Sequence, residues 1–257
     1  MIIATYNANS IRARMPVIER WLAGAAPDVL CLQETKVEDR DFPVEAIEAL
    51  GYRAVFRGEK SYNGVAILSR HEIENVSYGF DGAGSDEGTR LVSARILGID
   101  IVNTYVPQGT SPDSERFQYK LGWFGRLLEH FTGNYRTTDR LIWLGDFNVA
   151  PEPIDVHDPK RLLGHVGFHP DEHRALAAVK AWGFTDVFRK HEPGPGHYSF
   201  WDYRVRDSVA RGLGWRVDHI FATGPLAAAS VRAWIDRGPR VGERPSDHTP
   251  VAAEFSV

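Results

Sequence analysis

The sequence contains a single cysteine, Cys31, among its 257 residues, so the chain cannot form an internal disulfide. Cys31 lies in the apolar run DVLCLQ, which predicts a buried and unreactive thiol. The sequence also lacks any run that approaches the roughly 20 apolar residues needed to span a bilayer, and its start, MIIATYNANSIRAR, lacks the regions of a secretion signal. We therefore expect a soluble, cytoplasmic protein that does not bind a membrane.

A large net charge is also missing. The 30 Lys and Arg residues stand against 34 Asp and Glu residues, which gives a formal charge of −4 and a pI near 6.2. This balance excludes a protein that coats nucleic acid indiscriminately, because such binding relies on an excess of positive charge. It leaves specific nucleic-acid binding open, since a compact acidic centre can mask a basic rim in the total.

Short runs typical of β-strands are abundant, and most of them are bounded by Gly, Pro, Asp or Asn. They are IIATY, DVLCLQ, YRAVFR, GVAILS, RLVSARI, IDIVNTYV, LIWLGD, WRVDHIFA, AASVRAWI and VAAEF. With 43% hydrophobic residues and seven tryptophans, the chain can bury a substantial core. The pattern predicts a β-rich protein with ten or more strands.

Helical patterns lie between these strands. The clearest covers 114–131, where apolar residues recur at intervals of three and four. We expect a second helix over 17–22 behind Pro16 and a third over 171–182 that ends at Gly183. Helices inserted between hairpins predict an α/β sandwich, with two mainly antiparallel sheets face to face and helices outside. The glycine-rich segment at 79–88 has no phosphate-loop spacing and is expected to be an exposed loop.

Several predicted strands end in a carboxylate or amide side chain: Asn7, Glu34, Asp146 with Asn148, and Asp218. Each acid alone is typical of a turn or helix cap. If the sandwich brings these strand ends to one edge, however, they form a cluster of hard oxygen ligands. Such a cluster suits Mg²⁺ or Mn²⁺ rather than zinc, which prefers His and Cys.

Two other kinds of site fit the sequence less well. His169 and His173 in HPDEH have the spacing of a zinc pair, but Pro170 interrupts it and the glutamate misses the position found in zinc proteases. Serine hydrolysis is disfavoured because the chain has no GxSxG motif.

The segment RPSDHTPV at 244–251 places Asp247 and His248 immediately before the last predicted strand. Together with an acidic cluster, this pair is what phosphodiester hydrolysis requires: a metal that offsets the phosphate charge, a group that orients or deprotonates water, and an imidazole at the phosphate. Asp218 can orient His248 and support its charged form, although Asp247 competes for that role in sequence.

These segments resemble the exonuclease III family of apurinic/apyrimidinic endonucleases. The resemblance rests on TYNANSIRAR, PDVLCLQETK, GVAILSR, NTYVPQG, LGDFNVAP, SFWDYR, GWRVDH and RPSDHTPV, which follow one another from Thr5 to Val251. QETK, GDFN and SDH alone are shared by the wider endonuclease/exonuclease/phosphatase superfamily, whereas PQG, WDYR and GWRVDH narrow the match. The resemblance implies one domain over 1–257 with a four-layer α/β sandwich.

The resemblance further implies Mg²⁺-dependent cleavage of duplex DNA 5′ to abasic sites, with 3′-to-5′ exonuclease activity and cleaning of damaged 3′ ends. It assigns Glu34 as the principal metal ligand, with Asn7 beside it and Asp247 near the metal. Asp146 positions or activates water that Asn148 orients, and His248 with Asp218 stabilises the developing charge. Tyr105 contacts the phosphate, although its sequence context alone is also that of a half-buried sheet tyrosine.

The remaining implied residues bind DNA. An abasic sugar needs a pocket with apolar and aromatic walls, and the matched positions also fit an ordinary core. The pocket and its motif comprise Phe200, Trp201, Trp215 and Val217, and the residues matched to DNA contacts are Arg12, Lys36, Gln108, Lys120 and Arg204. This chain reads SFWDYR where bacterial exonuclease III reads SWFDYR, so the resemblance leaves the balance between endonuclease and exonuclease open.

Two alternatives remain at this point. One is a phosphoesterase on the same scaffold that acts on RNA or on a phosphorylated lipid or small molecule. The other is a DNA-binding module without catalysis, which the complete set of acidic residues disfavours. For the enzyme, we expect a monomer.

Overall fold

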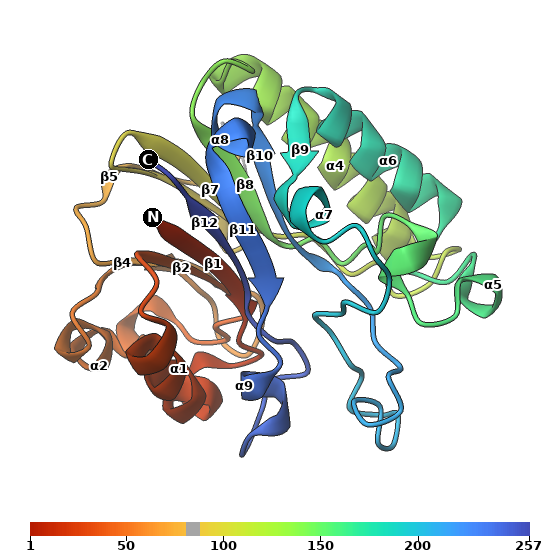
Figure 1. Cartoon of the computed structure of the whole chain (residues 1–257), viewed down its shortest axis with the longest axis horizontal. Coiled ribbons are helices and arrows are strands. Elements are labelled where there is room, and N and C mark those ends of the chain that lie inside the picture. The colour runs from red at the N-terminus through yellow and green to blue at the C-terminus, as the bar shows by residue number, and fades with distance from the viewer. Residues whose placement is uncertain (81–87) are drawn as a thin grey trace.

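Two sheets form the centre of the computed structural model, which describes residues 1–80 and 88–257 (Figure 1). In spatial order, sheet A contains β11 (Ser230–Ile235), β12 (Val251–Phe255), β1 (Ile2–Asn7), β2 (Val29–Gln33), β4 (Val65–Ser69) and β3 (Arg53–Arg57). Sheet B contains β5 (Glu74–Tyr78), β6 (Leu91–Ile96), β7 (Ile99–Tyr105), β8 (Leu141–Asp146), β10 (Asp218–Thr223) and β9 (Phe184–Asp186). All ten predicted strands are present, and the sequence patterns missed β5 and β9.

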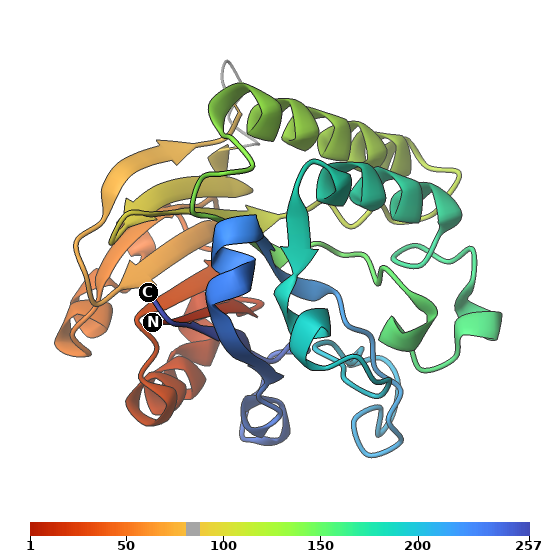
Figure 2. The same cartoon turned by 45° about the horizontal axis from the view of Figure 1, so that its top comes forward.

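Helices cover the outer face of each sheet, which gives the four layers of the predicted sandwich (Figures 1 and 2). Sheet A is covered by α1 (Ile11–Ala25) and α2 (Val44–Ala49), and sheet B by α4 (Glu115–Asn134) and α6 (Pro170–Ala181). The shorter helices are α5 (Pro159–Leu162), α7 (Val187–His191), α8 (Gly224–Ala229) and α9 (Gly238–Val241), with 3₁₀ turns η1 (Asp39–Asp41) and η2 (Pro153–Asp155). The fold class expected from the sequence is confirmed.

The layers are held together by three apolar cores. Aliphatic side chains such as Ile67, Ile101 and Ile142 fill the space between the sheets, where Cys31 is also buried. Burial raises the pKa of the Cys31 thiol, which confirms the expected unreactive cysteine. Trp21 of α1 packs on sheet A and Trp123 of α4 on sheet B. Each helix therefore buries one apolar stripe against its sheet.

A polar bridge crosses the aliphatic core between the sheets. Gln33 on β2 donates to Oδ1 of Asn103 on β7 at 2.6 Å and to Thr5 on β1 at 2.9 Å. The amide of Asn103 in turn donates to the carbonyls of Leu32 and Ala66 in sheet A, at 3.0 and 2.9 Å. Because an unsatisfied buried amide is costly, this network favours one alignment of the two sheets over shifted ones.

The first helix differs from its prediction. It begins at Ile11, so Pro16 lies inside the helix rather than at its start. Proline lacks the N–H that would bond to the carbonyl of Arg12. Both Pro16 and Arg12 are exposed, and water can satisfy that carbonyl, which makes the proline tolerable here. The other two helices agree with prediction, and the Ser114 side chain caps α4 by accepting from the Phe117 amide at 3.2 Å.

Two further expectations from the sequence concern the glycine-rich segment and membrane-spanning helices. Residues 81–87, most of the glycine-rich segment expected as a loop, lie outside the described residues. Within the part of the chain that is described, no helix has the length and apolar character required to cross a bilayer.

The strand directions bring the predicted site residues to one edge. β1 and β2 are parallel, and so are β7 and β8, so the carboxyl ends of each pair lie together. β10 runs antiparallel to β8 and β12 antiparallel to β1, so both of these strands begin at that same edge. The residues at the ends of β1, β2, β7 and β8 therefore lie near the residues that begin β10 and those that precede β12.

Candidate active site

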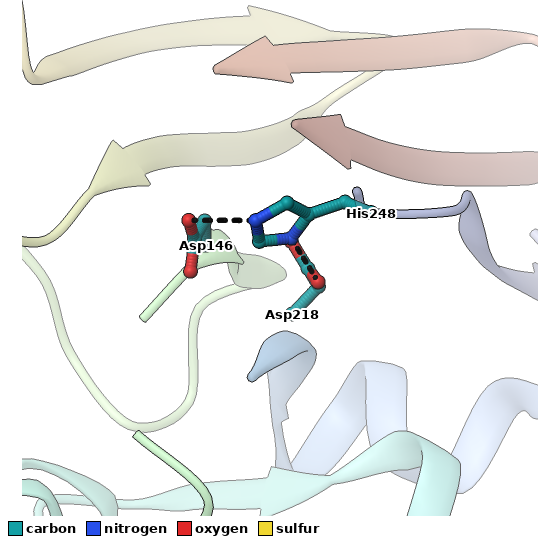
Figure 3. A group of neighbouring side chains, drawn as sticks. All are labelled: Asp146, Asp218 and His248. Atoms are coloured by element: carbon teal, nitrogen blue, oxygen red, sulfur yellow. Dashed lines mark hydrogen bonds and ion pairs between the residues drawn. The ribbon is translucent and has the colours of Figure 1, made fainter. Parts of the chain in front are cut away.

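A buried His248 lies between two carboxylates at this edge (Figure 3). Its Nδ1 is 2.8 Å from Oδ2 of Asp218, the first residue of β10, and its Nε2 is 3.8 Å from Oδ2 of Asp146, the last residue of β8. Asp146 and Asp218 are direct partners in the antiparallel ladder. The predicted partnership of Asp218 with His248 is present, and Asp247 does not take its place.

The two carboxylates give His248 a proton at neutral pH. Burial alone would lower the pKa of His248, but the negative charges of Asp218 and Asp146 and the hydrogen bond to Asp218 raise it to about 10. Burial raises the pKa of Asp146 to about 7. The positive charge of His248 opposes this rise, and the negative charge of Asp218 strengthens it. The site therefore holds a charged imidazole that can donate to an anion.

Asp146 is fixed by hydrogen bonds from two asparagines. Its Oδ1 accepts from the backbone N–H of Asn148 at 2.8 Å, and its Oδ2 accepts from the side-chain amides of Asn7 at 2.8 Å and Asn148 at 3.3 Å. Asn148 has a left-handed backbone, with φ of +51°. A non-glycine residue pays for this conformation, which turns the Asn148 side chain back toward the carboxylate.

Glu34 follows β2, and the Asn7 amide lies between Glu34 and Asp146. The Asn7 amide donates to Oε1 of Glu34 at 2.8 Å, and the Lys36 ammonium lies 2.6 Å from Oε2. Burial opposes ionisation of Glu34, but the charge of Lys36 and these hydrogen bonds outweigh it and hold the pKa of the Glu34 carboxyl below its ordinary value. Asn7, predicted as a metal ligand, serves here as a donor that joins Glu34 to Asp146.

A chain of polar contacts continues from Glu34 to Asp247. Lys36 also donates to Oδ1 of Asn9 at 2.6 Å, and the Asn9 amide donates to Oδ1 of Asp247 at 2.9 Å. The sequence analysis missed Asn9. Its signal was present, because Asn9 lies two residues beyond the strand-end Asn7, as Lys36 lies two beyond Glu34.

Two sets of side chains can be considered for a metal. Ligand atoms of Asp146, Asp218 and His248 lie within 4.8 Å of one another, so this buried group offers three metal-binding side chains. A protonated imidazole, however, has no free lone pair. Glu34 and Asn9 instead direct oxygens at a positive charge, the Lys36 ammonium, and Asn9 connects them to Asp247. Both sets can therefore contribute to a metal site, and oxygen donors such as those of the second set are the ligands that hard divalent cations prefer.

Tyr105, the last residue of β7, lies beside the two acids. Burial raises the pKa of its phenol well above the usual value, and the charges of Glu34 and Asp146 add to the rise. The Arg90 guanidinium lies over the Tyr105 ring, 4.9 Å from its centroid. The phenol is therefore a neutral donor, of the kind that can hydrogen-bond to a phosphate oxygen.

Phe200, Trp215 and Val217 gather beside His248 in one small apolar cluster. The Phe200 ring centroid is 4.8 Å from that of His248, and Phe200 pairs with Trp215 through backbone bonds of 2.9 Å in both directions. Phe200 and Trp215 are only partly buried. The three predicted pocket residues are thus brought together, with two of them open to solvent.

A buried ionic network adjoins this cluster on the side away from solvent. Arg216 lies between Trp215 and Val217, is fully buried, and donates to Asp155 at 2.6 and 3.1 Å and to Asp186 at 2.8 Å. It also donates to Nδ1 of His219, whose Nε2 is 2.8 Å from the carbonyl of Val149. Burial and the charge of Arg216 lower the pKa of His219 to about 3, so this imidazole is neutral and its tautomer is fixed.

The predicted DNA contacts, taken with Trp201 of the pocket motif, include exposed, partly buried and buried side chains, and Lys36 is partly buried. Arg12, Gln108 and Arg204 are exposed; Arg12 pairs with Asp41 at 2.9 Å and Arg204 with Asp202 at 2.7 Å. Lys120 and Trp201 are 0% and 1% exposed. These two assignments are wrong as direct contacts, because neither side chain reaches the surface that DNA can touch.

The rival zinc pair is absent. His169 is the N-cap of α6, where its Nδ1 accepts from the amide of Asp171 at 3.1 Å, and His173 Nε2 is 3.0 Å from the carbonyl of Ala150. Both histidines have structural partners. Among the described residues, neither belongs to a group of metal-binding side chains.

Comparisons with known proteins agree with this geometry. The sequence profile described as the Endonuclease/Exonuclease/phosphatase family matches residues 4–248. An exodeoxyribonuclease III from Haemophilus influenzae is 33% identical, with 99% of this chain and 100% of the relative covered. An AP endonuclease structure from Archaeoglobus fulgidus is 49% identical with a TM-score of 0.98, and a Neisseria 3′ phosphatase bound to a product DNA hairpin is 36% identical with a TM-score of 0.95; both comparisons cover 100% of each chain.

Proposed function

Because this chain belongs to the endonuclease/exonuclease/phosphatase family, we propose that it is a DNA-repair nuclease that cleaves duplex DNA 5′ to abasic sites. It is a hydrolase that acts on DNA phosphodiester bonds. The observation that carries the finer proposal is the position of the apolar cluster: Phe200 lies directly against His248, so a sugar held there has its phosphate at the charged imidazole. The product ends are a 3′-hydroxyl and a 5′ sugar phosphate.

The metal in this proposal is Mg²⁺, for which Mn²⁺ can substitute. Glu34 and Asp247 would hold it, with Asn9 between them and with Asn7 setting the orientation of Glu34. A bound divalent cation supplies positive charge that offsets the charge of the scissile phosphate. Lys36 would move from the Glu34 carboxylate toward DNA phosphate, because both are anions of similar hydrogen-bonding capacity.

The residues of the chain divide the remaining work among them. Asp146 accepts a hydrogen bond from the attacking water and Asn148 orients it, because both side chains are held at one point by their mutual contacts. His248 donates from Nε2 to a phosphate oxygen and is kept protonated and oriented by Asp218. Tyr105 donates a hydrogen bond from its neutral phenol to another phosphate oxygen. The assignment of the general base stays open between these groups.

The proposal extends to 3′ ends. A Neisseria protein with the same fold is named a 3′ phosphatase, and the H. influenzae relative is named an exodeoxyribonuclease. We propose that the same site removes 3′-terminal nucleotides and damaged 3′ groups, because each reaction breaks a phosphate ester at a deoxyribose 3′ oxygen. Arg12, Gln108 and Arg204 are the exposed residues placed to contact the DNA backbone. The enzyme acts as a monomer of one domain over residues 1–257.

Removal of divalent metal provides the first test. We expect EDTA to abolish incision of a labelled duplex that carries a stable abasic analogue, and excess Mg²⁺ to restore it, because the Glu34 and Asp247 carboxylates would then lack their cation. A gel assay measures the product. A second duplex with a recessed, intact 3′ end reports the accompanying exonuclease. Undiminished incision in EDTA would contradict the metal requirement, and a folded protein that cleaves neither duplex would point to another phosphoester substrate.

The substitution Phe200→Ala tests the pocket. Removing this aromatic wall should relax the rejection of nucleotides that carry a base, so we expect the ratio of kcat/KM at the abasic analogue to that at an intact nucleotide to fall by about tenfold. Leu162→Ala is the control, because Leu162 packs on the same cluster from α5, whereas Phe200 supplies the ring that contacts His248. If Phe200→Ala leaves the ratio unchanged, the pocket is elsewhere.

A further inference from the structure

Lys120 of α4 and Glu172 of α6 form an ion pair with no exposure to solvent, with Nζ 2.5 Å from Oε1. Removing two charges from water is costly, and a buried pair is tolerated only where further hydrogen bonds satisfy both groups. Burial lowers the pKa of Lys120, an effect that the charge of Glu172 opposes. The role of this pair must therefore lie in the other groups that its two side chains bind.

The pair contacts the backbone of three loops. Lys120 Nζ donates to the carbonyl of Asn148 at 2.7 Å and to that of Gln108 at 3.1 Å. Glu172 Oε2 accepts from the amides of Gly167 and His169 at 2.8 and 3.1 Å. The ammonium thus has three acceptors, one for each N–H, and both oxygens of the carboxylate accept hydrogen bonds.

Two of these loops carry the proposed chemistry. Asn148 donates to Asp146 from both its backbone and its side chain, and its left-handed backbone fixes the direction in which its carbonyl points. Gln108 lies in the loop that follows Tyr105, the last residue of β7. Because the Asn148 amide also donates to the carbonyl of Val106 at 2.9 Å, the two loops are tied to each other at the site and to Lys120 behind it.

The third loop reaches the apolar pocket. Gly167 adopts φ of +88°, and an added Cβ would lie 3.3 Å from the Trp215 ring, so the backbone of this loop packs directly on the pocket wall. The Gly167 carbonyl accepts from the amide of Ala150 at 2.7 Å. Glu172 therefore anchors the loop behind Trp215, just as Lys120 anchors the loops of Asn148 and Gln108.

We infer that Lys120 and Glu172 are positioning residues, which hold Asn148 against Asp146 through the Asn148 carbonyl and align this pair with the pocket. The inference rests on the proposed function of the Asp146 site. An offset of the order of 1 Å in a group that orients a reactant can lower a rate about 100-fold, whereas contacts on the DNA-facing surface stay in place. Loss of the pair should accordingly act on kcat rather than on KM.

The test replaces both charges together, because either single loss leaves the other charge buried. Lys120→Met with Glu172→Gln keeps the side-chain volumes and removes the ammonium that holds the carbonyls. We expect kcat on the abasic duplex to fall by about 10- to 100-fold, with KM changed by less than about threefold. Glu172→Gln alone keeps the Lys120 contacts to both carbonyls and should show a smaller decrease in kcat. It also provides a result if the double variant does not fold.

Two controls separate positioning from a general loss of stability. Val179→Ala removes core volume from α6 about two turns away from Glu172, and its kcat should stay within about twofold of that of the unchanged protein. In a protein that already carries Asn148→Ala, the double substitution should cost less than about twofold, because Lys120 acts through Asn148.

The inference is overturned if the folded double variant, or folded Glu172→Gln alone when the double variant fails to fold, keeps the full kcat. It is also overturned if the effects of the double substitution at Lys120 and Glu172 and of Asn148→Ala multiply. Failure of the proposed function is a separate result, since the unchanged protein would then fail on the abasic duplex. In that case the recessed 3′ end is the substrate on which the same variants are compared.

Discussion

Asp146→Asn should lower the rate of incision at an abasic analogue by about 1000-fold while leaving duplex binding intact. The amide retains an oxygen for the Asn7 donor but presents an N–H2 group where the carboxylate accepts from Asn148. It can therefore neither align the attacking water nor take up its proton. Binding should persist or strengthen, because a negative charge beside the phosphate is removed.

Single-turnover incision and fluorescence anisotropy of a labelled duplex measure the two quantities. Asp100→Asn is the matched control, because Asp100 is the second residue of β7, at the opposite end of sheet B from Asp146, and its carboxylate accepts from the Arg95 guanidinium. It should change neither quantity by more than about twofold. An Asp146→Asn protein with undiminished turnover would rule out the proposed role of this carboxylate.

The second large effect concerns His248. We expect His248→Gln to lower kcat by about 100- to 10,000-fold, because a neutral amide replaces a charged donor at the phosphate. Asp218→Asn should cause a smaller loss, since Asp218 acts by keeping His248 oriented and protonated. The measurement is kcat at saturating duplex and Mg²⁺ for both single variants.

A double-mutant cycle then separates these two roles. If Asp218 acts only through His248, adding Asp218→Asn to His248→Gln should cost less than about twofold, although each substitution is harmful alone. Fully multiplicative effects would show that Asp218 has a role of its own. Oδ1 of Asp218, which has no hydrogen-bond partner among the residues that the structure describes, is the atom from which such a role would come.

The fold was predictable from the sequence because its central strands are buried on both faces and read as apolar runs. The strands that the patterns missed both lie at edges of sheet B. β5 has mostly exposed side chains, and β9 is three residues long, so neither shows the pattern that burial imposes. Pro16 misled the prediction of α1, since an exposed proline interrupts a helix less than the local rule implies.

The assignment of Lys120 failed for a reason that the spacing itself contained. Lys120 lies three residues after Phe117 and four before Phe124, which places it on the apolar face of α4. Glu172 occupies the same kind of position relative to Leu176 on α6. Opposite charges on the buried faces of two helices predict a pair in the core, but only the three-dimensional structure shows that these two helices are neighbours and which carbonyls the lysine holds.

The position of Asn9 after a strand end marked it as a candidate site residue, but its hydrogen-bonding partners could not be predicted from the sequence, for a related reason. Its contacts with Lys36 and Asp247 join residues 27 and 238 positions away, and no local pattern indicates such pairings. Asp146, Asp218 and His248 could be predicted because the first two lie at strand ends and His248 lies shortly before β12, and the sandwich brings these positions together.

The position of β12 has a consequence for folding. The last strand lies between β1 and β11, and the N-terminal amine of Met1 donates to the carbonyl of Phe255 at 2.7 Å. Sheet A therefore cannot close until β12 has paired with β1 and β11, and contacts of such long sequence separation form slowly. Asp247 and His248 enter the site with the same segment. Assembly of the catalytic site is thus coupled to the pairing of β12, because the step that completes sheet A also brings in these two residues.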